Sequence, residues 1–216
     1  PAQDGAWILM PTNRDKYGYD WQGLGEWDGL AALQAFTDSL PGVPLELRAQ
    51  YRPDPSRILF TGHSMGGHGC LVYATKMADS ALGAACAAGW IRFDHYVSEW
   101  QGVSSSFADT HLLALLSSAV GSYHTDLMAV HLKGIPFLAR LGQLDESVNP
   151  WNLRRYARVL DQVNGVNGFA EISEVKGEGH WFDTVMSGKA MAAFFNETLR
   201  EGGGRKPGVP PEWRVR

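Results

Sequence analysis

A serine between two glycines is the first feature of this sequence that could do chemistry. The stretch GHSMG at 62–66 fits the pattern G-x-S-x-G. In enzymes that use this pattern, the serine sits on a sharp turn between a strand and a helix, which exposes its hydroxyl. The apolar run at 57–61 predicts such a strand, and the residues at 65–77 predict the helix. The alternative is an ordinary capping serine in a glycine-rich turn.

Ser64 can act as a nucleophile only if a base removes its proton, so the sequence must also supply partners. A carboxylate follows the apolar run at 136–140, in GQLDESV, and a histidine follows the run at 169–175, in GEGHWF. Both runs predict strands, and the carboxyl ends of parallel strands meet at one edge of a sheet. We therefore expect Asp145 and His180 to reach Ser64 as orienting acid and general base.

One further group completes this predicted site, and one alternative stays open. The backbone N–H of Met65, at the start of the predicted helix, is expected to stabilise a developing oxyanion. Glu146 stands beside Asp145 and is the alternative acid. His63 and His68 flank the serine, but they are local in sequence and point elsewhere around the turn. We do not expect either of them to be the base.

The remaining histidines give no sign of a metal site. His95, His111, His124 and His131 are scattered, and no pair of them combines with carboxylates at the spacing of zinc ligands. A serine nucleophile with a histidine base needs no cofactor. We therefore expect neither a metal nor a cofactor.

The elements that must position these residues alternate along the chain. Apolar runs predict strands at 6–10, 57–61, 82–88, 136–140 and 169–175, and helical patterns cover 27–40, 65–77, 150–164 and 184–199. Asn149 and Pro150 are a good helix start, and Gly165 is a good helix end. Alternation of this kind predicts an α/β fold, with a mostly parallel sheet and helices on both of its faces.

Residues 91–133 interrupt the alternation and form a predicted insertion with short helical patches such as 111–118. Insertions at the carboxyl ends of the strands are where such folds build binding pockets. Trp90, Tyr96 and Trp100 lie in or near this segment and are candidates to contact a substrate. The alternative is that these three residues are ordinary aromatics of the core and its rim.

Composition excludes several other classes of protein. With 216 residues, 44% of them hydrophobic and 19% charged, the chain can build one sizeable core. The net charge of −4 does not indicate a basic surface that would bind nucleic acid. The sequence also lacks a basic amphipathic stretch of the kind that binds a membrane surface. The longest apolar stretch, 81–91, is far too short to span a bilayer. Cys70 and Cys86 lie in apolar surroundings and are expected to be buried free thiols.

The three motifs together resemble those of the α/β-hydrolases, and more narrowly those of the prolyl oligopeptidase (S9-type) catalytic domain and its esterase relatives. The matching segments are RILFTGHSMGG, GQLDESV and GEGHWF, with MPTNRDKYGYDWQGLGEWDG further upstream. The resemblance extends from about residue 6 to residue 199. It implies a catalytic domain over 1–200, followed by a Gly/Pro-rich linker or tail over 201–216.

The resemblance also implies what the site does. Ser64 would attack a peptide or ester carbonyl through an acyl-enzyme intermediate, with Asp145 and His180 completing a triad. The family's first strands, and a loop that supplies an oxyanion donor, are expected to precede Pro1 and to be absent from this sequence. Two alternatives stay open: a carboxylic ester hydrolase with the same site, and a non-catalytic hydrolase-like binding module.

Overall fold

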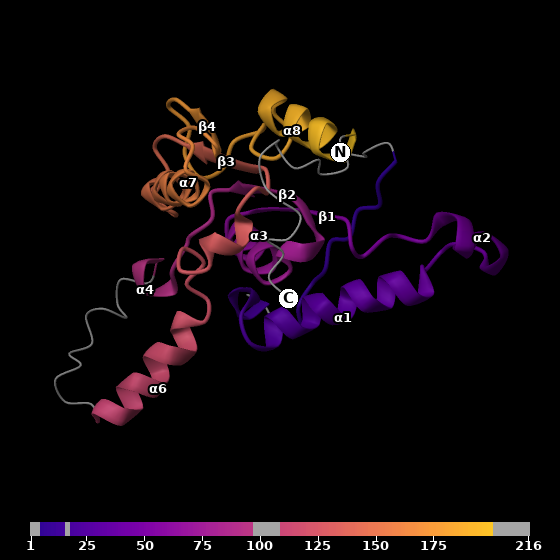
Figure 1. The fold of residues 1–216 in the computed structure, drawn as a ribbon, viewed down its shortest axis with the longest axis horizontal. Helices are drawn as coiled ribbons and strands as arrows, with labels where there is room; N and C mark the ends of the chain where they lie inside the picture. Colours follow the sequence, from indigo (N-terminus) through magenta and orange to yellow (C-terminus); the bar gives the residue numbers. More distant parts are fainter. Residues whose placement is uncertain (1–4, 16–17, 97–108, 201–216) are drawn as a thin grey trace.

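A computed structural model of the chain describes residues 5–15, 18–96 and 109–200 (Figure 1). Turns and short 3-10 helices connect the longer elements. In chain order these elements are η1 (Gly18–Trp21), α1 (Leu24–Ser39), α2 (Leu45–Tyr51), β1 (Ile58–His63), α3 (Met65–Lys76), η2 (Ala78–Ser80), β2 (Ala81–Ala87), α4 (Phe93–Tyr96), α6 (Thr110–Gly121), η4 (Ala129–Leu132), β3 (Phe137–Gly142), α7 (Trp151–Asn164), β4 (Glu171–Val175) and α8 (Lys189–Arg200).

The four strands form one parallel sheet in the order β1-β2-β3-β4. His63 pairs with Ala87, Ala87 pairs with Arg140, and Gly142 pairs with Val175. The carboxyl ends of all four strands therefore lie along one edge of the sheet. The loops that follow these strands are the ones that the sequence predicts to carry the site.

Helices cover both faces of the sheet, because successive side chains along a strand point to opposite faces. On one face Ala84, Cys86 and Ala139 pack against apolar side chains of α3 and α7. On the other face Ala85 and Leu138 pack against α8. Figure 1 shows α8 on one side of the sheet and α3 on the other. This arrangement confirms the predicted α/β class with its parallel sheet between helices.

Both cysteines lie inside this core as free thiols, as the sequence predicts. Burial raises the pKa of the Cys86 thiol to about 12, so it is a neutral packing group. Its sulfur lies 3.2 Å from the backbone carbonyl of Gly67 in α3. Small side chains in β2 let α3 approach the sheet closely.

The predicted strand at 6–10 is wrong. The segment has no strand partner among the described residues, and Trp7, Ile8 and Met10 are exposed. Trp7 instead packs edge-on against Phe36 of α1, with ring centroids 5.9 Å apart, and its Nε1–H donates to the carbonyl of Tyr51 at 2.8 Å. The apolar run therefore reflects contacts with helices and not with a sheet.

The insertion between β2 and β3 contains α4, α6 and η4. Asp109 caps α6, because its carboxylate accepts from the N–H groups of His111 at 2.9 Å and Leu112 at 3.0 Å. None of the residues of α6 is buried, and Figure 1 shows this helix projecting away from the sheet. Within the described residues, no helix is both long enough and apolar enough to cross a membrane.

Candidate active site

Ser64 lies on the sharp turn between β1 and α3, in a strained conformation. Its backbone has φ 59° and ψ −120°, a combination that residues other than glycine rarely adopt. The turn is held by a hydrogen bond from the Ser64 N–H to the carbonyl of Ala87, at 2.9 Å. Met65 is the first residue of α3, so its N–H has no carbonyl partner within the helix.

Two glycines make this turn possible by letting backbones approach each other closely. A Cβ on Gly62 would lie 2.0 Å from the carbonyl oxygen of Gly66, and one on Gly67 would lie 2.5 Å from that of Ala87. A Cβ on Gly66 itself would meet nothing within 4 Å. The structure therefore requires glycine at 62 and 67 for lack of space, but not at 66.

Asp145 is held rigidly in the loop after β3. The residue is 6% exposed, and its Oδ1 accepts from the backbone N–H groups of Ser147 at 2.9 Å and Val148 at 2.8 Å. Its other oxygen, Oδ2, lies 2.7 Å from Nδ1 of His180. Glu146, the alternative acid, is exposed at the surface. The structure thus brings Asp145 and not Glu146 to the histidine.

His180 lies between the serine and the carboxylate. Its Nε2 is 2.8 Å from the Oγ of Ser64, while Nδ1 faces Asp145, and its side chain is 8% exposed. With Nδ1–H donating to the carboxylate, the lone pair of Nε2 points at the serine hydroxyl. The three residues are far apart in the sequence: Ser64 precedes His180 by 116 positions, and Asp145 precedes it by 35. This geometry suits proton transfer from serine to histidine.

The loop that carries His180 is docked directly onto the end of β3. A Cβ on Gly142 would lie 2.1 Å from the carbonyl oxygen of Gly179, so the two backbones are in close contact. The N–H of Leu144 donates to the carbonyl of Glu178 at 2.8 Å, and that of Gln143 donates to Val175 at 2.9 Å. The acid loop and the histidine loop therefore form one hydrogen-bonded unit.

Arg140 of β3 fixes the chain just beyond the histidine. Its guanidinium donates to Ser173 Oγ at 2.7 Å and to the carbonyl of Thr184 at 3.3 Å, and it lies 5.2 Å from the ring centre of Phe182. Burial lowers the pKa of Arg140 from its ordinary value. The turns at 183–187 that receive this contact explain why α8 begins at Lys189, later than the predicted helix start at 184.

Two further histidines flank Ser64 and have different surroundings. His63 is half-buried, and its Nε2 lies 2.9 Å from the backbone carbonyl of His180. His68 is fully buried, with Nδ1 2.9 Å from the carbonyl of Trp90 and Nε2 3.0 Å from the amide nitrogen of Gln22. Burial lowers the pKa of both, that of His68 to about 4, so both rings are neutral.

The predicted substrate-contacting aromatics lie in different places. Trp90 is 1% exposed, because its ring is stacked between His68 and Tyr96, with centroids 4.9 Å and 4.1 Å away. The prediction that Trp90 contacts a substrate is therefore corrected: both of its faces are covered by other rings. Tyr96 is 39% exposed and remains available. Trp100 lies outside the described residues.

Tyr96 lies within the electrostatic field of the site. Burial raises the pKa of its hydroxyl, and the carboxylates of Asp20 and Asp145 raise it further. The ring of Tyr96 covers one face of Trp90, with centroids 4.1 Å apart. A large aromatic face with a polar tip is a common lining for a binding pocket.

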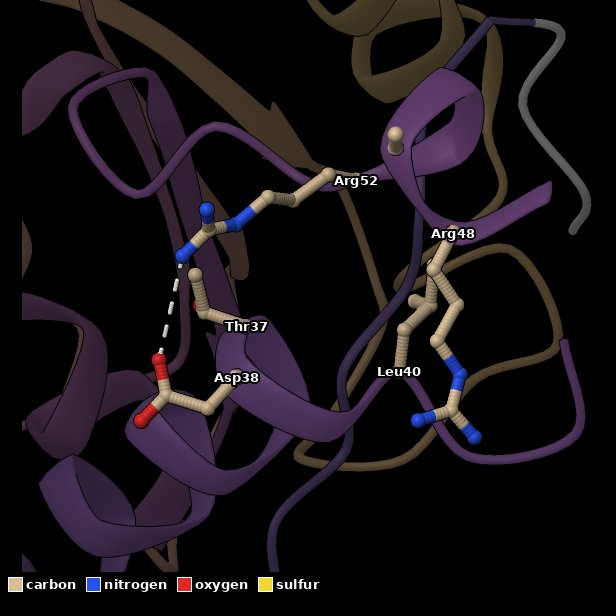
Figure 2. Close-up of a pocket in the computed structure, with 6 residues that line it drawn as sticks. Thr37, Asp38, Leu40, Arg48 and Arg52 are labelled. Atoms are coloured by element: carbon tan, nitrogen blue, oxygen red, sulfur yellow. Dashed lines mark ion pairs between the residues drawn. The ribbon is translucent and has the colours of Figure 1, made fainter. Parts of the chain in front are cut away.

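A cavity of about 240 Å³ lies elsewhere, between the end of α1 and α2 (Figure 2). Thr37, Leu40 and Ala49 contribute to its walls, and Arg52 approaches Asp38 at 3.9 Å across it. None of its lining residues belongs to the Ser64 site, and it holds no activated nucleophile. In the described ranges, no cluster of three His, Cys, Asp or Glu residues is arranged to hold a metal ion.

Sequence reasoning missed the groups that hold the histidine loop in place. From the sequence alone, His63 is only a residue not expected to be the base, and Arg140 is only part of a predicted strand. The signal for Arg140 was a charged residue in an otherwise apolar strand run, PFLAR. Gly142 begins the segment GQLDESV, but its close contact with Gly179 is a tertiary feature that one sequence does not reveal.

The parallel sheet, the strained serine turn and the two loops beside it define an α/β-hydrolase fold. The chain belongs to the prolyl oligopeptidase family, whose model matches residues 3–202. Over 198 residues it is 26% identical to an uncharacterised secreted protein of Arthroderma benhamiae, matching 88% of this chain and 20% of that protein.

Solved structures of peptidases share the fold. A puromycin-hydrolysing peptidase of Mycobacterium tuberculosis has a TM-score of 0.57 at 20% identity, over 89% of this chain and 27% of the other. The acylaminoacyl peptidase of Pyrococcus horikoshii has a TM-score of 0.56 at 16% identity, over 91% and 31%. The dipeptidyl peptidase 4 of Porphyromonas gingivalis has a TM-score of 0.53 at 16% identity, over 85% and 23%. The chain spans less than a third of each of these proteins.

Proposed function

We propose that this domain is a serine hydrolase that cleaves peptide or ester bonds through a triad of Ser64, His180 and Asp145. The observation that carries the proposal is the continuous chain of short contacts, 2.8 Å from Ser64 Oγ to His180 Nε2 and 2.7 Å from His180 Nδ1 to Asp145. Membership of a peptidase family supports it independently. Neither a metal nor a cofactor takes part in the proposed reaction.

The proposed reaction has two halves. The Oγ of Ser64 forms a bond to the substrate carbonyl carbon while its proton passes to Nε2 of His180. The tetrahedral intermediate then collapses, and His180 gives that proton to the leaving amine or alcohol. A water molecule repeats these steps on the acyl-enzyme, which releases the acid and restores Ser64.

The surrounding groups stabilise the charges that arise. Asp145 holds Nδ1–H of His180, so that the ring keeps the tautomer that accepts at Nε2 and is stabilised as an imidazolium. The free N–H of Met65 at the start of α3 is placed to donate to the oxyanion, with the helix N-terminus behind it. Tyr96 offers an aromatic wall for the acyl or leaving group.

Covalent labelling with a fluorophosphonate tests the proposal. The wild-type chain is expected to label, and Ser64→Ala is expected to abolish labelling because the attacking oxygen is gone. Ser187→Ala removes an exposed serine outside the site and serves as the matched control. A wild-type chain that does not label, or a Ser64→Ala variant that labels equally, would overturn the proposal and favour a non-catalytic binding module.

A second measurement separates a peptidase from an ester hydrolase, since both would use the same triad. Matched ester and amide substrates with the same acyl group are compared by kcat/KM. Measurable amide cleavage supports a peptidase, as the family predicts. Activity confined to esters supports the carboxylic ester hydrolase alternative.

A further inference from the structure

His63, the residue before the nucleophile, contacts the proposed base in two ways. Its Nε2 lies 2.9 Å from the backbone carbonyl of His180. Its ring centroid lies 4.7 Å from that of His180, with the planes inclined at 41°. The first contact holds the main chain of His180, and the second supports one side of its imidazole.

The direction of the hydrogen bond follows from the acceptor. A carbonyl oxygen only accepts, so the hydrogen of this bond must be on Nε2 of His63. Burial is the main cause that lowers the pKa of His63 below its ordinary value, which keeps the ring neutral. A neutral ring is required here, because a positive charge would oppose formation of the imidazolium on His180.

Trp181 packs against the same pair of rings. It meets His63 edge-on, with centroids 4.3 Å apart at 61°, and meets His180 at 5.4 Å and 90°. Trp181 is nevertheless 74% exposed, so it covers the pair from the solvent side without being part of the core. Trp181 therefore adds an exposed ring contact to the contacts that His63 makes with its own strand and with His180.

We propose that His63 is a positioning residue, which ties the main chain of His180 to the strand that carries Ser64. The inference rests on the proposed function of the triad. His63 ends β1 and Ser64 follows it directly, so the nucleophile and the anchor of the base belong to one rigid turn. Any shift of the histidine loop must then break the His63 bond before it can lengthen the contact between Ser64 and His180.

The expected signature is a loss of turnover. A displacement of about 1 Å at a reacting group can cost about 10²-fold in rate. Removing the donor at 63 is expected to lower kcat by about 10- to 100-fold, because the displaced base acts in the transition state. KM is expected to change less than about threefold, since His63 contacts the main chain of His180 and is not proposed to contact the substrate.

Three variants at this position separate the hydrogen bond from the ring. His63→Phe keeps an aromatic ring and removes the donor. His63→Gln places an amide N–H close to where Nε2 lies, whereas His63→Asn is equally polar but too short to reach the carbonyl. His131→Phe is the matched control, because His131 also contacts a backbone carbonyl, that of Thr75 at 2.9 Å, away from the site.

The experiment measures kcat and KM on an activated ester, with rates normalised to the fraction that a fluorophosphonate titrates. His63→Phe and His63→Asn are expected to lose turnover, His63→Gln to keep it within about threefold, and His131→Phe to match wild type. If His63→Phe does not fold, the test rests on comparing the turnover of His63→Gln with that of His63→Asn.

Two results would overturn the inference: unchanged turnover in His63→Phe or His63→Asn, or a His63→Gln variant as slow as His63→Asn. Either result leaves the triad intact, because Ser64 would still label in the wild type. Failure of the wild type to label instead contradicts the proposed function itself, and the role of His63 falls with it.

Discussion

The two sides of Ser64 are built by different means. On the base side, the Nδ1–H of His180 donates to Asp145, and the backbone carbonyl of His180 accepts from His63. The loop that carries His180 also accepts backbone hydrogen bonds from Gln143 and Leu144, just after β3. On the insertion side, a stack of three rings from His68 through Trp90 to Tyr96 fills the space beside α3. The first side fixes the positions of the atoms that move a proton in the proposed reaction, and the second builds a surface. Substitutions on the base side should therefore lower turnover, whereas those at the buried rings of the insertion side should change stability and leave turnover nearly unchanged.

The strongest test of this contrast is the acid. Asp145→Asn replaces an acceptor with an amide, so His180 settles in the tautomer that cannot accept the serine proton. We expect kcat to fall by about 10³- to 10⁴-fold with the fold intact. Turnover of an activated ester and the circular dichroism spectrum check both parts.

Glu146→Gln is the matched control for this substitution. Glu146 is adjacent in sequence but exposed, so its amide should change the rate by less than about threefold. An equal loss at the two positions, or a larger one at Glu146, would contradict the assignment of Asp145.

The second test concerns the contact between the two loops. Gly142→Ala places a Cβ 2.1 Å from the carbonyl oxygen of Gly179, which must push the histidine loop away from β3. We expect a loss of about 1–3 kcal/mol in unfolding free energy and of about 10²-fold in kcat. Urea unfolding and steady-state kinetics measure the two effects.

Gly121→Ala provides the control, because a Cβ on this last residue of α6 meets nothing within 4 Å. It is expected to leave turnover unchanged and to alter stability by no more than about 1 kcal/mol. Normal turnover in Gly142→Ala would show that the docking of the loop on β3 is not needed to place His180.

The same contrast explains what one sequence can predict. The serine turn, the acid loop and the histidine loop each follow a strand, and strand ends in a parallel sheet share an edge, so the residues that meet there follow from the order of elements. The sequence also predicts the two ends of α7. Asn149 Oδ1 accepts from the N–H of Trp151 at 2.9 Å at its start, and Gly165 ends the helix in a left-handed conformation.

The failures share a different cause. Apolar residues at 6–10 carry the pattern of a strand, but whether they find a neighbouring strand or a helix is decided by parts of the chain far away. Trp90 is aromatic and lies near the insertion, yet its burial depends on the rings that stack on both of its faces. The role of His63 likewise depends on a loop 117 positions away.

The last test addresses the insertion side through its buried histidine. Burial is the main cause that lowers the pKa of His68 from the ordinary 6.5 to about 4. Between these values the unfolded chain binds a proton that the folded chain excludes, so stability must fall as the pH falls from about 6.5 to about 4. The contribution of this one group to that loss is about 3 kcal/mol.

His68→Asn removes the titration and keeps a donor near Nδ1, where the carbonyl of Trp90 accepts at 2.9 Å. Urea unfolding at about pH 7.5 and about pH 4 is compared for the two proteins, since carboxylates common to both contribute equally to each difference. The variant is expected to lose about 3 kcal/mol less than wild type, while its kcat at the higher pH stays within about threefold. An equal loss of stability in both proteins would mean that His68 is not held neutral by its burial. A steep fall in kcat with unchanged pH dependence would instead place His68 among the groups that serve the base, and the division between the two sides of Ser64 would fail.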